Sequence, residues 1–411
     1  MLLIKNIGTL QTPLGSFRHA GRKQGENQKL HNAAVLIDGG AIRSITAEGR
    51  LPQGAERAER VIDAEGRLVT PGLIDCHTHM VFGGYRQGEI PLKLRGAGYL
   101  DILRAGGGIL DTVKKTRAAS EEALFEKSMG FLDEMLDLGV TAVESKSGYG
   151  LDLENELKQL RVNQRLNSAH PVEVVSTFLG AHAVPEEYKG REDAYISLLI
   201  DQVLPAVSAG KLADFCDVFC EEGVFNVPQS RRLLLAAQAM GLKARIHADE
   251  IEAIGGAELA GEIGAVSAEH LIATSEAGMA AMAAGGVIAD LLPATSFYLN
   301  KTFAPARRMI ELGIPVAIAS DFNPGSCPSL NLQLAMNMGY LKYRMTPEEV
   351  LTAVTVNAAC SLGLADRLGT LEEGKEADLV VWDAPDMEML VYRFGSNLAK
   401  TVIKNGEVVR T

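Results

Sequence analysis

The sequence predicts an α/β protein whose central part is a (β/α)8 barrel of the TIM type. Eight apolar, strand-like segments alternate with amphipathic helical segments over roughly 300 residues, the pattern of a barrel of parallel strands. Polar residues, above all histidines, fall at the carboxyl ends of several of these strands, where such a barrel carries its chemistry. The alternative is an open doubly wound sheet, which usually has a glycine-rich fingerprint after its first strand, whereas this position reads His77-Thr78-His79.

Residues 1 to 66 have the short strands and tight turns of a small β-sandwich. We expect strands at residues 2–6, 32–37 and 41–47, and Asp38-Gly39-Gly40 between the last two is a hairpin signal. The polar stretch from Thr12 to Leu30 interrupts these strands, and we expect a loop or a flexible arm there. His19 and His31 have no motif around them, so we expect both at the surface.

The barrel is expected to occupy residues 67 to 366. Helical stretches are predicted at residues 120–138, 154–169 and 230–240, and a last helix at residues 346–362. The strands are expected to end near His79, Lys146, Phe178, Glu221, His247, His270, Leu291 and Asp321. From residue 367 the chain returns to strands and turns, and Asn405-Gly406 marks the last of these turns.

Charge and composition exclude several classes of partner. The net charge is −12, so nucleic acid and anionic membrane surfaces would be repelled, and a small-molecule substrate is expected instead. No apolar run reaches the roughly 18 residues of a spanning helix, and the start of the chain lacks the features of a signal peptide. Five scattered cysteines fit reduced thiols rather than a disulfide framework. We therefore expect a cytoplasmic protein.

Three predicted strand ends carry residues that suit one metal ion. His77 and His79 are two residues apart and would project from the same face of a strand. His247 and Asp321 end two further apolar strands, and three imidazoles with one carboxylate suit one zinc or iron ion with room for water. The alternative readings are packed or surface histidines and, for Asp321, a loop-capping aspartate before Asn-Pro-Gly.

Longer strings resemble the amidohydrolase superfamily from end to end. Val69-Thr-Pro-Gly before an apolar strand ending in Asp-x-His-x-His is the entry signature of that superfamily. The other strings are Phe82-Gly-Gly-Tyr-Arg86, Ala105-Gly-Gly-Gly, Glu144-Ser-Lys-Ser-Gly-Tyr149, Thr177-Phe-Leu-Gly-Ala-His182, His247-Ala-Asp-Glu250 and Ser320-Asp-Phe-Asn323-Pro-Gly-Ser326. The resemblance implies that residues 1–66 and 367–411 join in one discontinuous β-sandwich beside the barrel.

The same resemblance implies roles for catalytic residues. Glu250 would be the proton shuttle, His270 would hydrogen-bond the reacting oxygen or water, and Asp321 would take a proton besides binding metal. Asp249 and Glu269 are expected to support the site. A satisfied core histidine is the alternative for His270. Binuclear relatives add a lysine from the fourth strand, which is absent here, so one ion is expected, although Glu221 offers a conceivable bridging carboxylate.

Candidate substrate-binding residues follow from chemistry as well as resemblance. Arg86 offers a planar fork to a carboxylate, with a surface ion pair as its alternative role. Tyr149 and His182 suit a flat ring, or else pack at the barrel rim, and Tyr99 is a weaker candidate. The remaining candidates lie in the loop after the eighth strand, whose amides and hydroxyl would hold a polar group: Asn323, Gly325 and Ser326. Gly106 to Gly108 are expected to form a flexible lid or a tight turn.

The activity implied by the resemblance is hydrolytic ring opening of 4-imidazolone-5-propanoate to N-formimidoyl-L-glutamate in histidine degradation. A deaminase of a cyclic amidine or pyrimidine would use the same metal, glutamate and histidine, but Arg86 favours a substrate with a carboxylate. A non-catalytic binding protein on a decayed barrel would lack metal ligands, and none is missing here. We also expect a homo-oligomer, a dimer.

Overall fold

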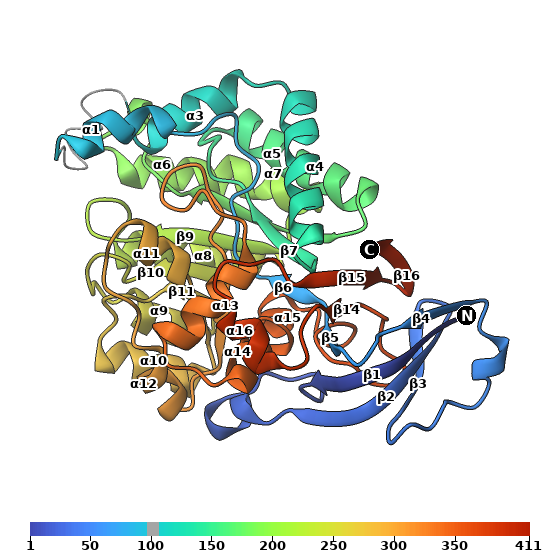
Figure 1. Ribbon diagram of the computed structural model, residues 1–411. Coiled ribbons are helices and arrows are strands. Elements are labelled where there is room, and N and C mark those ends of the chain that lie inside the picture. Colours follow the sequence, from blue (N-terminus) through green and yellow to red (C-terminus); the bar gives the residue numbers. More distant parts are fainter. Residues whose placement is uncertain (97–106) are drawn as a thin grey trace.

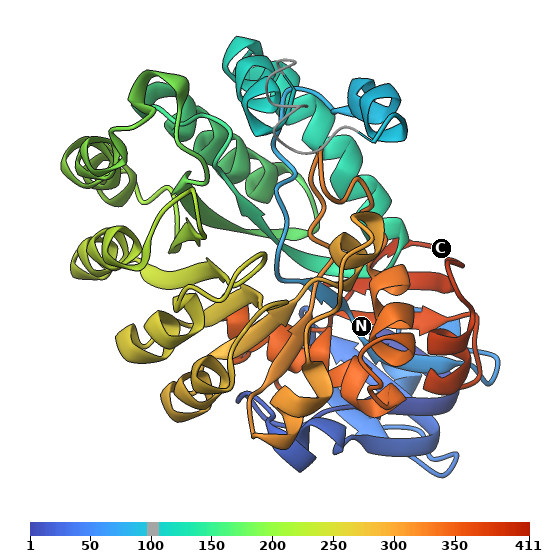
Figure 2. The ribbon, with the colours of Figure 1, turned by 90° about the vertical axis from the view of Figure 1, so that its left-hand side faces the viewer.

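Eight parallel strands form a nearly closed barrel at the centre of the protein, as the computed structural model shows for the residues it describes, 1–96 and 107–411 (Figure 2). Tyr99 and Gly106 lie outside these residues. The strands pair in chain order: β6 (Leu73–Asp75), β7 (Val140–Lys146), β8 (Glu173–Ala181), β9 (Phe215–Cys220), β10 (Lys243–Ala248), β11 (Ser267–His270), β12 (Ile288–Leu291) and β13 (Val316–Ile318). The predicted barrel is confirmed.

The barrel closes at β6 and β13 without a regular ladder between them. One parallel bridge joins Thr78 to Phe322 just beyond the two strands. Elsewhere along the edges of β6 and β13, polar groups from other segments of the chain bond the unpaired backbone groups. The side-chain amide of Gln24 bonds both the N–H and the C=O of Val316, and Val354 accepts the N–H of Ile74 at 2.9 Å. These contacts complete backbone hydrogen bonding that a ladder would otherwise supply.

The longer helices pack outside the strands and turn their buried apolar residues towards them. The longer ones begin at side-chain caps: Ser120 before α4 (Glu121–Asp137), Asp152 before α5 (Leu153–Ala169) and Asn226 before α8 (Val227–Ala239). Among the described residues, no helix combines the length and apolar character needed to cross a membrane. The remaining helices are α1 (Ile90–Leu94), α3 (Ile109–Ala118), α6 (Glu192–Leu198), α7 (Leu204–Ala209), α9 (Gly256–Ile263), α10 (Glu276–Gly285), α11 (Pro293–Tyr298), α12 (Ala306–Glu311), α13 (Leu332–Leu341), α14 (Pro347–Ala353), α15 (Val356–Leu362) and α16 (Met387–Tyr392).

Strands from both ends of the chain form one separate sheet beside the barrel, as expected (Figure 1). The sheet has its own apolar core, in which Ile4 and Val35 pack with Leu379 and Ile403 from the other end of the chain. The strand order is β16 (Glu407–Arg410), β15 (Ala399–Lys404), β14 (Leu379–Trp382), β5 (Leu68–Pro71), β1 (Leu2–Thr12), β2 (Gln28–Asp38) and β3 (Ala41–Thr46), with β4 (Arg60–Asp63) beside β1.

Two local predictions were wrong. The stretch from Thr12 to Leu30 contains the expected loop, at residues 13–27, but its ends belong to β1 and β2, the loop is packed rather than a flexible arm, and the prediction of His19 at the surface is wrong. His19 is buried there, and its ring nitrogens lie 2.9 Å from the Leu14 carbonyl oxygen and 3.1 Å from that of Lys23. The single helix predicted at residues 346–362 is two helices, α14 and α15, broken where Thr355 leaves helical geometry and Val354 turns its carbonyl to β6.

Candidate metal centre and active site

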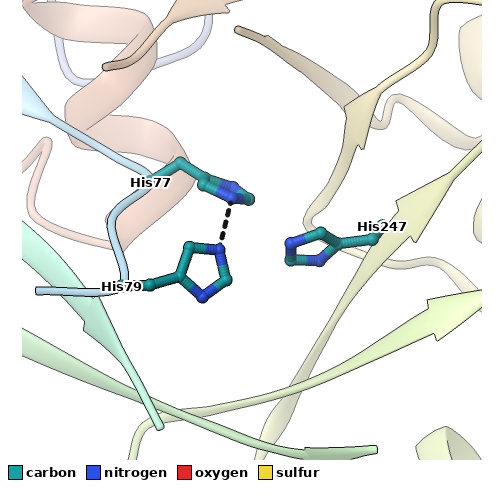
Figure 3. Close-up of side chains that lie close together, drawn as sticks. All are labelled: His77, His79 and His247. Carbon is teal, nitrogen blue, oxygen red and sulfur yellow. Dashed lines mark hydrogen bonds between the residues drawn. The ribbon is translucent and has the colours of Figure 1, made fainter. Parts of the chain in front are cut away.

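His77 and His79 lie side by side on the segment after β6, and the ring of His247 faces them from another strand (Figure 3). Both are buried, and their Nε2 atoms lie 3.3 Å apart. The first barrel strand ends at Asp75, so both histidines stand on the segment just beyond it. Asp75 itself accepts the backbone N–H of Ser320 at 3.0 Å, which fastens this segment to the end of the last strand.

His247 and Asp321 complete the cluster from two other strands. The ring of His247 in β10 lies 4.7 Å, centroid to centroid, from that of His77, and its buried Nε2 has no hydrogen-bond partner (Figure 3). Asp321 follows β13, and its Oδ1 lies 3.5 Å from the Nε2 atoms of both His77 and His79. Its Oδ2 accepts the hydroxyl of Thr295 at 2.5 Å. The backbone of Asp321 is left-handed, with φ of 54°.

The spacing of these atoms fits a small cation. Ligand atoms about 2.1 Å from a tetrahedral ion lie about 3.4 Å from one another, close to the 3.3 and 3.5 Å separations found here. Potential ligand atoms of His77, His79 and His247 all lie within 4.8 Å of one another. Imidazole nitrogens and a carboxylate oxygen that converge in this way, with His247 Nε2 buried and without a hydrogen-bond partner among the described residues, suit a zinc or iron ion.

The Glu269 carboxylate contacts two of the three clustered histidines at their Nδ1 atoms. Its Oε2 lies 3.2 Å from His77 Nδ1 and 2.9 Å from His247 Nδ1, although neither contact has regular hydrogen-bond geometry. Its Oε1 is held by the side chains of Lys146, at 3.2 Å, and Arg245, at 2.7 Å. A carboxylate on Nδ1 leaves Nε2 as the ligand atom, so the expected supporting role of Glu269 agrees with its position.

Lys146 and Arg245 belong to a charged cluster in the barrel interior. Lys146 Nζ also donates to Glu144 at 2.7 Å and to Asp217 at 2.8 Å, and Arg245 donates to Asp290 at 2.7 Å. These side chains are fully buried. Burial disfavours the charged form of Lys146, but the surrounding carboxylates outweigh it and raise its pKa. Lys146 therefore stays charged within this cluster.

Glu250 and His270 lie next to each other, close to the histidine cluster. His270 ends β11, and its Nε2 is 3.8 Å from Glu250 Oε2. Lys301 approaches the second oxygen of Glu250, with Nζ 3.6 Å from Oε1. Burial lowers the pKa of His270, and the Glu250 carboxylate partly offsets this effect. An acid–base pair beside candidate metal ligands can move protons to and from a bound molecule.

Arg86 reaches the same pocket from the loop before α1. Its guanidinium lies against Gly325, where a Cβ atom would come within 1.1 Å of Nη2, so only glycine leaves room for it. Its side chain is 16% exposed, and its buried Nε has no hydrogen-bond partner. Nε lies 4.0 Å from Glu89 Oε1, a long ion pair, and Arg86 lines the pocket, where its guanidinium can meet an anionic ligand.

The loop after β13 differs from expectation in one respect. The backbone amides of Gly325 and Ser326 donate to Asn323 Oδ1 at 2.9 and 2.7 Å, and the Ser326 hydroxyl donates to the same oxygen at 3.0 Å. The sequence predicts that these donors hold a polar group of the ligand. Asn323 instead folds its own loop, because an asparagine side chain can replace backbone acceptors in a tight turn.

Tyr149 and His182 form an aromatic wall next to the histidines. The His182 ring stacks on His79 with centroids 4.9 Å apart and an interplanar angle of 17°, and Tyr149 lies 5.2 Å from His182. His182 Nδ1 is 3.1 Å from the Gly148 carbonyl oxygen. Burial and the nearby His247 lower the pKa of His182 to about 3, so this ring is neutral.

One pocket joins nearly all predicted site residues. Those that line it are His79, Arg86, Tyr149, His182, His247, Glu250, His270, Asp321, Asn323 and Ser326, with Ile109 and Phe219 added by the structure. His77 and Gly325 lie behind this lining, His77 fully buried and Gly325 under Arg86. Gly108 is at the start of α3, and its N–H donates to Glu89 at 2.6 Å, which places a turn there.

Glu221 has a different place from the bridging ligand considered above. Its two carboxylate oxygens accept the backbone amides of Glu222, Ile251 and Glu252. They point to loop backbone rather than to the histidines. Asp249 likewise accepts the amide of Gly256 at 3.2 Å, in agreement with a supporting role.

Sequence reasoning missed Lys301, Thr295 and the charged cluster. For the cluster a signal existed: Glu144 and Lys146 are two apart in an apolar strand, as are Arg245 and His247, so each pair shares one face. A charge that shares a face with a site histidine points into the barrel. Lys301 and Thr295 lie on a loop and a short helix after β12, where no periodicity marks them.

Comparison with known proteins agrees with this architecture. A family model described as the amidohydrolase family matches residues 68–409. An imidazolonepropionase of Alkaliphilus metalliredigens is 50% identical over 99% of this chain and 97% of its own length, and one of Fusobacterium nucleatum is 49% identical over 99% and 98%.

Solved structures share the fold at low identity. A 5-methylcytosine deaminase from Klebsiella pneumoniae has a TM-score of 0.76 and 20% identity over 99% of this chain and 97% of its own. An atrazine chlorohydrolase from Arthrobacter aurescens, solved with zinc, has a TM-score of 0.69 and 18% identity over 100% of this chain and 95% of its own. At these identities the likeness shows the fold alone.

The barrel, the terminal sheet and the imidazole cluster are those of a metal-dependent hydrolase, and the chain belongs to the amidohydrolase family. Within that family, the relatives that match it at about half of all positions over nearly the full length are imidazolonepropionases. The chain is a hydrolase of this group.

Proposed function

We propose that the protein opens the ring of 4-imidazolone-5-propanoate by hydrolysis to give N-formimidoyl-L-glutamate, a step of histidine degradation. The observation that carries this proposal is the pocket in which the guanidinium of Arg86 stands near an imidazole cluster and an acid–base pair. The names of the relatives that are about half identical over nearly the full length support the same reaction.

One zinc or iron ion per chain is proposed for the cluster of His77, His79, His247 and Asp321, whose atoms have the spacing and chemistry for it. When bound, such an ion lowers the pKa of water towards about 7 and polarises a carbonyl oxygen. The imidazole of His247 is fixed by carboxylates on its Nδ1 side, so that its Nε2 faces the site.

Glu250, His270 and Asp321 are proposed to move the protons. Water adds to the ring carbonyl carbon, the bond from this carbon to the ring nitrogen breaks, and the nitrogen takes up a proton. Nε2 of His270 orients the water or the developing oxyanion. Asp321 or Glu250 accepts a proton from the water, and Glu250, whose Oε2 lies 3.8 Å from His270 Nε2, delivers that proton to the leaving nitrogen.

The remaining pocket residues are proposed to bind the substrate. Arg86 pairs with the propanoate carboxylate, and Glu250 bonds a ring nitrogen before it delivers its proton. Tyr149 and His182 flank the flat ring. Asn323, Gly325 and Ser326 act mainly by shaping the loop on which the Arg86 guanidinium rests.

A substrate panel on enzyme of defined metal content tests the proposed function. We expect turnover of 4-imidazolone-5-propanoate and its loss after chelation, with recovery when zinc or iron(II) is returned. Cytosine and cyclic amidines without a carboxylate serve as the contrast, because a deaminase would release ammonia from them. If cytosine or a cyclic amidine releases ammonia and the imidazolone ring is not opened, the protein is a deaminase instead.

We further propose that the enzyme works in the cytoplasm as a homodimer. Tyr392 and Phe394, at the end of α16 and just after it, are 73% and 54% exposed, and exposed aromatic side chains of this kind favour a contact surface. Light scattering on the purified protein gives the number of chains per particle. A monomer at the enzyme concentration of the rate assay would contradict the dimer, but it would not bear on the proposed reaction.

A further inference from the structure

Glu221 lies where two neighbouring loops of the barrel rim meet. It follows β9 directly, and the register pairs Cys220 of β9 with Ala248 of β10. Glu221 is therefore level with the residues that follow β10, among them Glu250. Although it carries a charge, it is only 1% exposed.

Its carboxylate is used entirely for backbone groups. Oε2 accepts the N–H of Ile251 at 2.9 Å, and Oε1 accepts those of Glu252 at 3.2 Å and Glu222 at 2.9 Å. Two of these three amides belong to the residues immediately after Glu250. A buried carboxylate that accepts several amides holds them firmly, because the loss of any acceptor would leave a polar group unpaired.

The loop that carries Glu250 has little regular structure to hold it otherwise. It runs without helix or strand from Asp249 to Gly255, and both of these residues have left-handed backbones, with φ of 51° and 100°. Within the loop, Ile254 N–H donates to the carbonyl of Glu252, and beyond it Gly256 N–H donates to Asp249. Ile251 is 54% exposed, whereas Ile254 packs against the core, so apolar packing holds the far end of the loop and not the residue next to Glu250.

We propose that Glu221 is the positioning residue for Glu250: by clamping the two amides that follow Glu250, it holds that carboxyl beside His270. This inference rests on the proposed function, in which Glu250 delivers a proton. A turn cap with no influence on catalysis is the competing explanation, and it predicts an effect on stability alone. A shift of about 1 Å in a reacting group can lower a rate by about 10²-fold, so the two explanations differ measurably.

Glu221→Gln tests the clamp with a small change. Glutamine keeps the size of the side chain but offers one acceptor oxygen in place of two, so one loop amide loses its partner. We expect kcat for 4-imidazolone-5-propanoate to fall roughly 10- to 100-fold, while KM and metal content stay within about twofold of the wild type. The matched control is Glu222→Gln, the same change at the exposed neighbouring position, which should leave all three unchanged.

A double-mutant cycle with Glu250→Gln separates positioning from general loss of structure. If Glu221 acts through Glu250, adding Glu221→Gln to Glu250→Gln should lower kcat by less than about threefold, because the group it positions is already inactive. An equal fall in both backgrounds, an unchanged kcat, or a loss of metal would each overturn the inference. An active wild type with an unaffected Glu221→Gln variant contradicts only this inference, whereas an inactive wild type contradicts the proposed function.

Glu221→Asp keeps the experiment decisive if the glutamine variant fails to fold. Aspartate retains both acceptor oxygens on a shorter side chain, so the loop should be held less tightly. A smaller fall in kcat than that of Glu250→Gln, with full metal content, supports the clamp. A folded Glu221→Asp enzyme with the kcat of the wild type overturns it.

Discussion

Two layers of buried polar residues lie inside the barrel, and they differ in how far their groups are paired. In the lower layer every cation has carboxylate partners within 3.2 Å: Lys146 with Glu144, Asp217 and Glu269, and Arg245 with Glu269 and Asp290. The upper layer contains imidazole nitrogens without partners, among them His247 Nε2, and its members are His77, His79, His247, His270 and Asp321.

The difference indicates which layer serves structure and which serves chemistry. Buried charges without partners are costly, so a protein keeps them paired unless a ligand completes them. In the lower layer both cations have their carboxylate partners within the protein, and Glu269 of this layer also contacts His77 and His247. The upper layer is completed by what binds there. Variants of the upper layer should therefore change activity more than stability, and variants of the lower layer the reverse.

His247→Ala is expected to have the largest effect. It removes one of three imidazoles from the cluster, so metal content should fall close to zero and kcat/KM should drop by several kcal/mol, more than about 10³-fold. Elemental analysis beside a rate assay measures both, and His31→Ala at the exposed surface is the control. Full retention of metal would remove His247 from the metal site.

Glu250→Gln should separate chemistry from binding within the upper layer. Glutamine keeps size and hydrogen bonding but cannot deliver a proton, so kcat should fall roughly 10² to 10⁴-fold with metal and substrate still bound. Metal content, KM and kcat are measured on the same preparation. If metal content falls before turnover does, Glu250 serves the cluster instead of the proton transfer.

Lys146→Met tests the lower layer. It leaves three buried carboxylates without their shared cation, which should reduce the free energy of unfolding by about 3 to 5 kcal/mol. Denaturant titration measures the loss. Lys400→Met breaks an exposed pair with Glu65 and should cost less than about 1 kcal/mol. Equal stability of the two variants would contradict the contrast between the layers.

Arg86→Ala should weaken the enzyme without unfolding it. Loss of a desolvated guanidinium partner should lower kcat/KM for the carboxylate substrate by about 2 to 5 kcal/mol. Arg86→Lys keeps the charge but loses the planar fork, so it should restore only part of the activity. Kinetics on both variants, with the exposed Arg50→Ala as control, decide the assignment. An unchanged kcat/KM of Arg86→Ala would contradict the assignment of Arg86 to the substrate carboxylate.

Thr295→Val should have the smallest effect. It removes the hydroxyl that donates to Asp321 Oδ2 and keeps the shape of the side chain, so metal affinity should fall about 10- to 100-fold. Competition with a chelator measures that affinity. Thr46→Val in the terminal sheet, which loses a hydroxyl bond to the Arg50 carbonyl, should leave it unchanged. Equal affinities of the two variants would show that Asp321 needs no such support.

The sequence by itself determined the barrel and the membership of its polar rim. Alternating apolar strands and amphipathic helices leave few other architectures, and parallel strands bring their carboxyl ends to one side whatever the loops do. For this reason His77, His79, His247, His270 and Asp321 could be placed near one another before any coordinates. The division of the chain at residues 66 and 366 and the roles of the site residues stay predictions.

Only the tertiary structure decided which polar groups satisfy one another. Whether the Asn323 amide faces a ligand or its own loop, whether Glu221 meets the histidines or the amides after Glu250, and whether His19 is exposed all depend on contacts between distant segments. Sequence periodicity carries no information about such contacts, because they follow from loop paths and side-chain directions rather than from strand or helix geometry. A buried polar group takes whichever partner the fold brings within about 3 Å, and that choice exists only once the chain has folded.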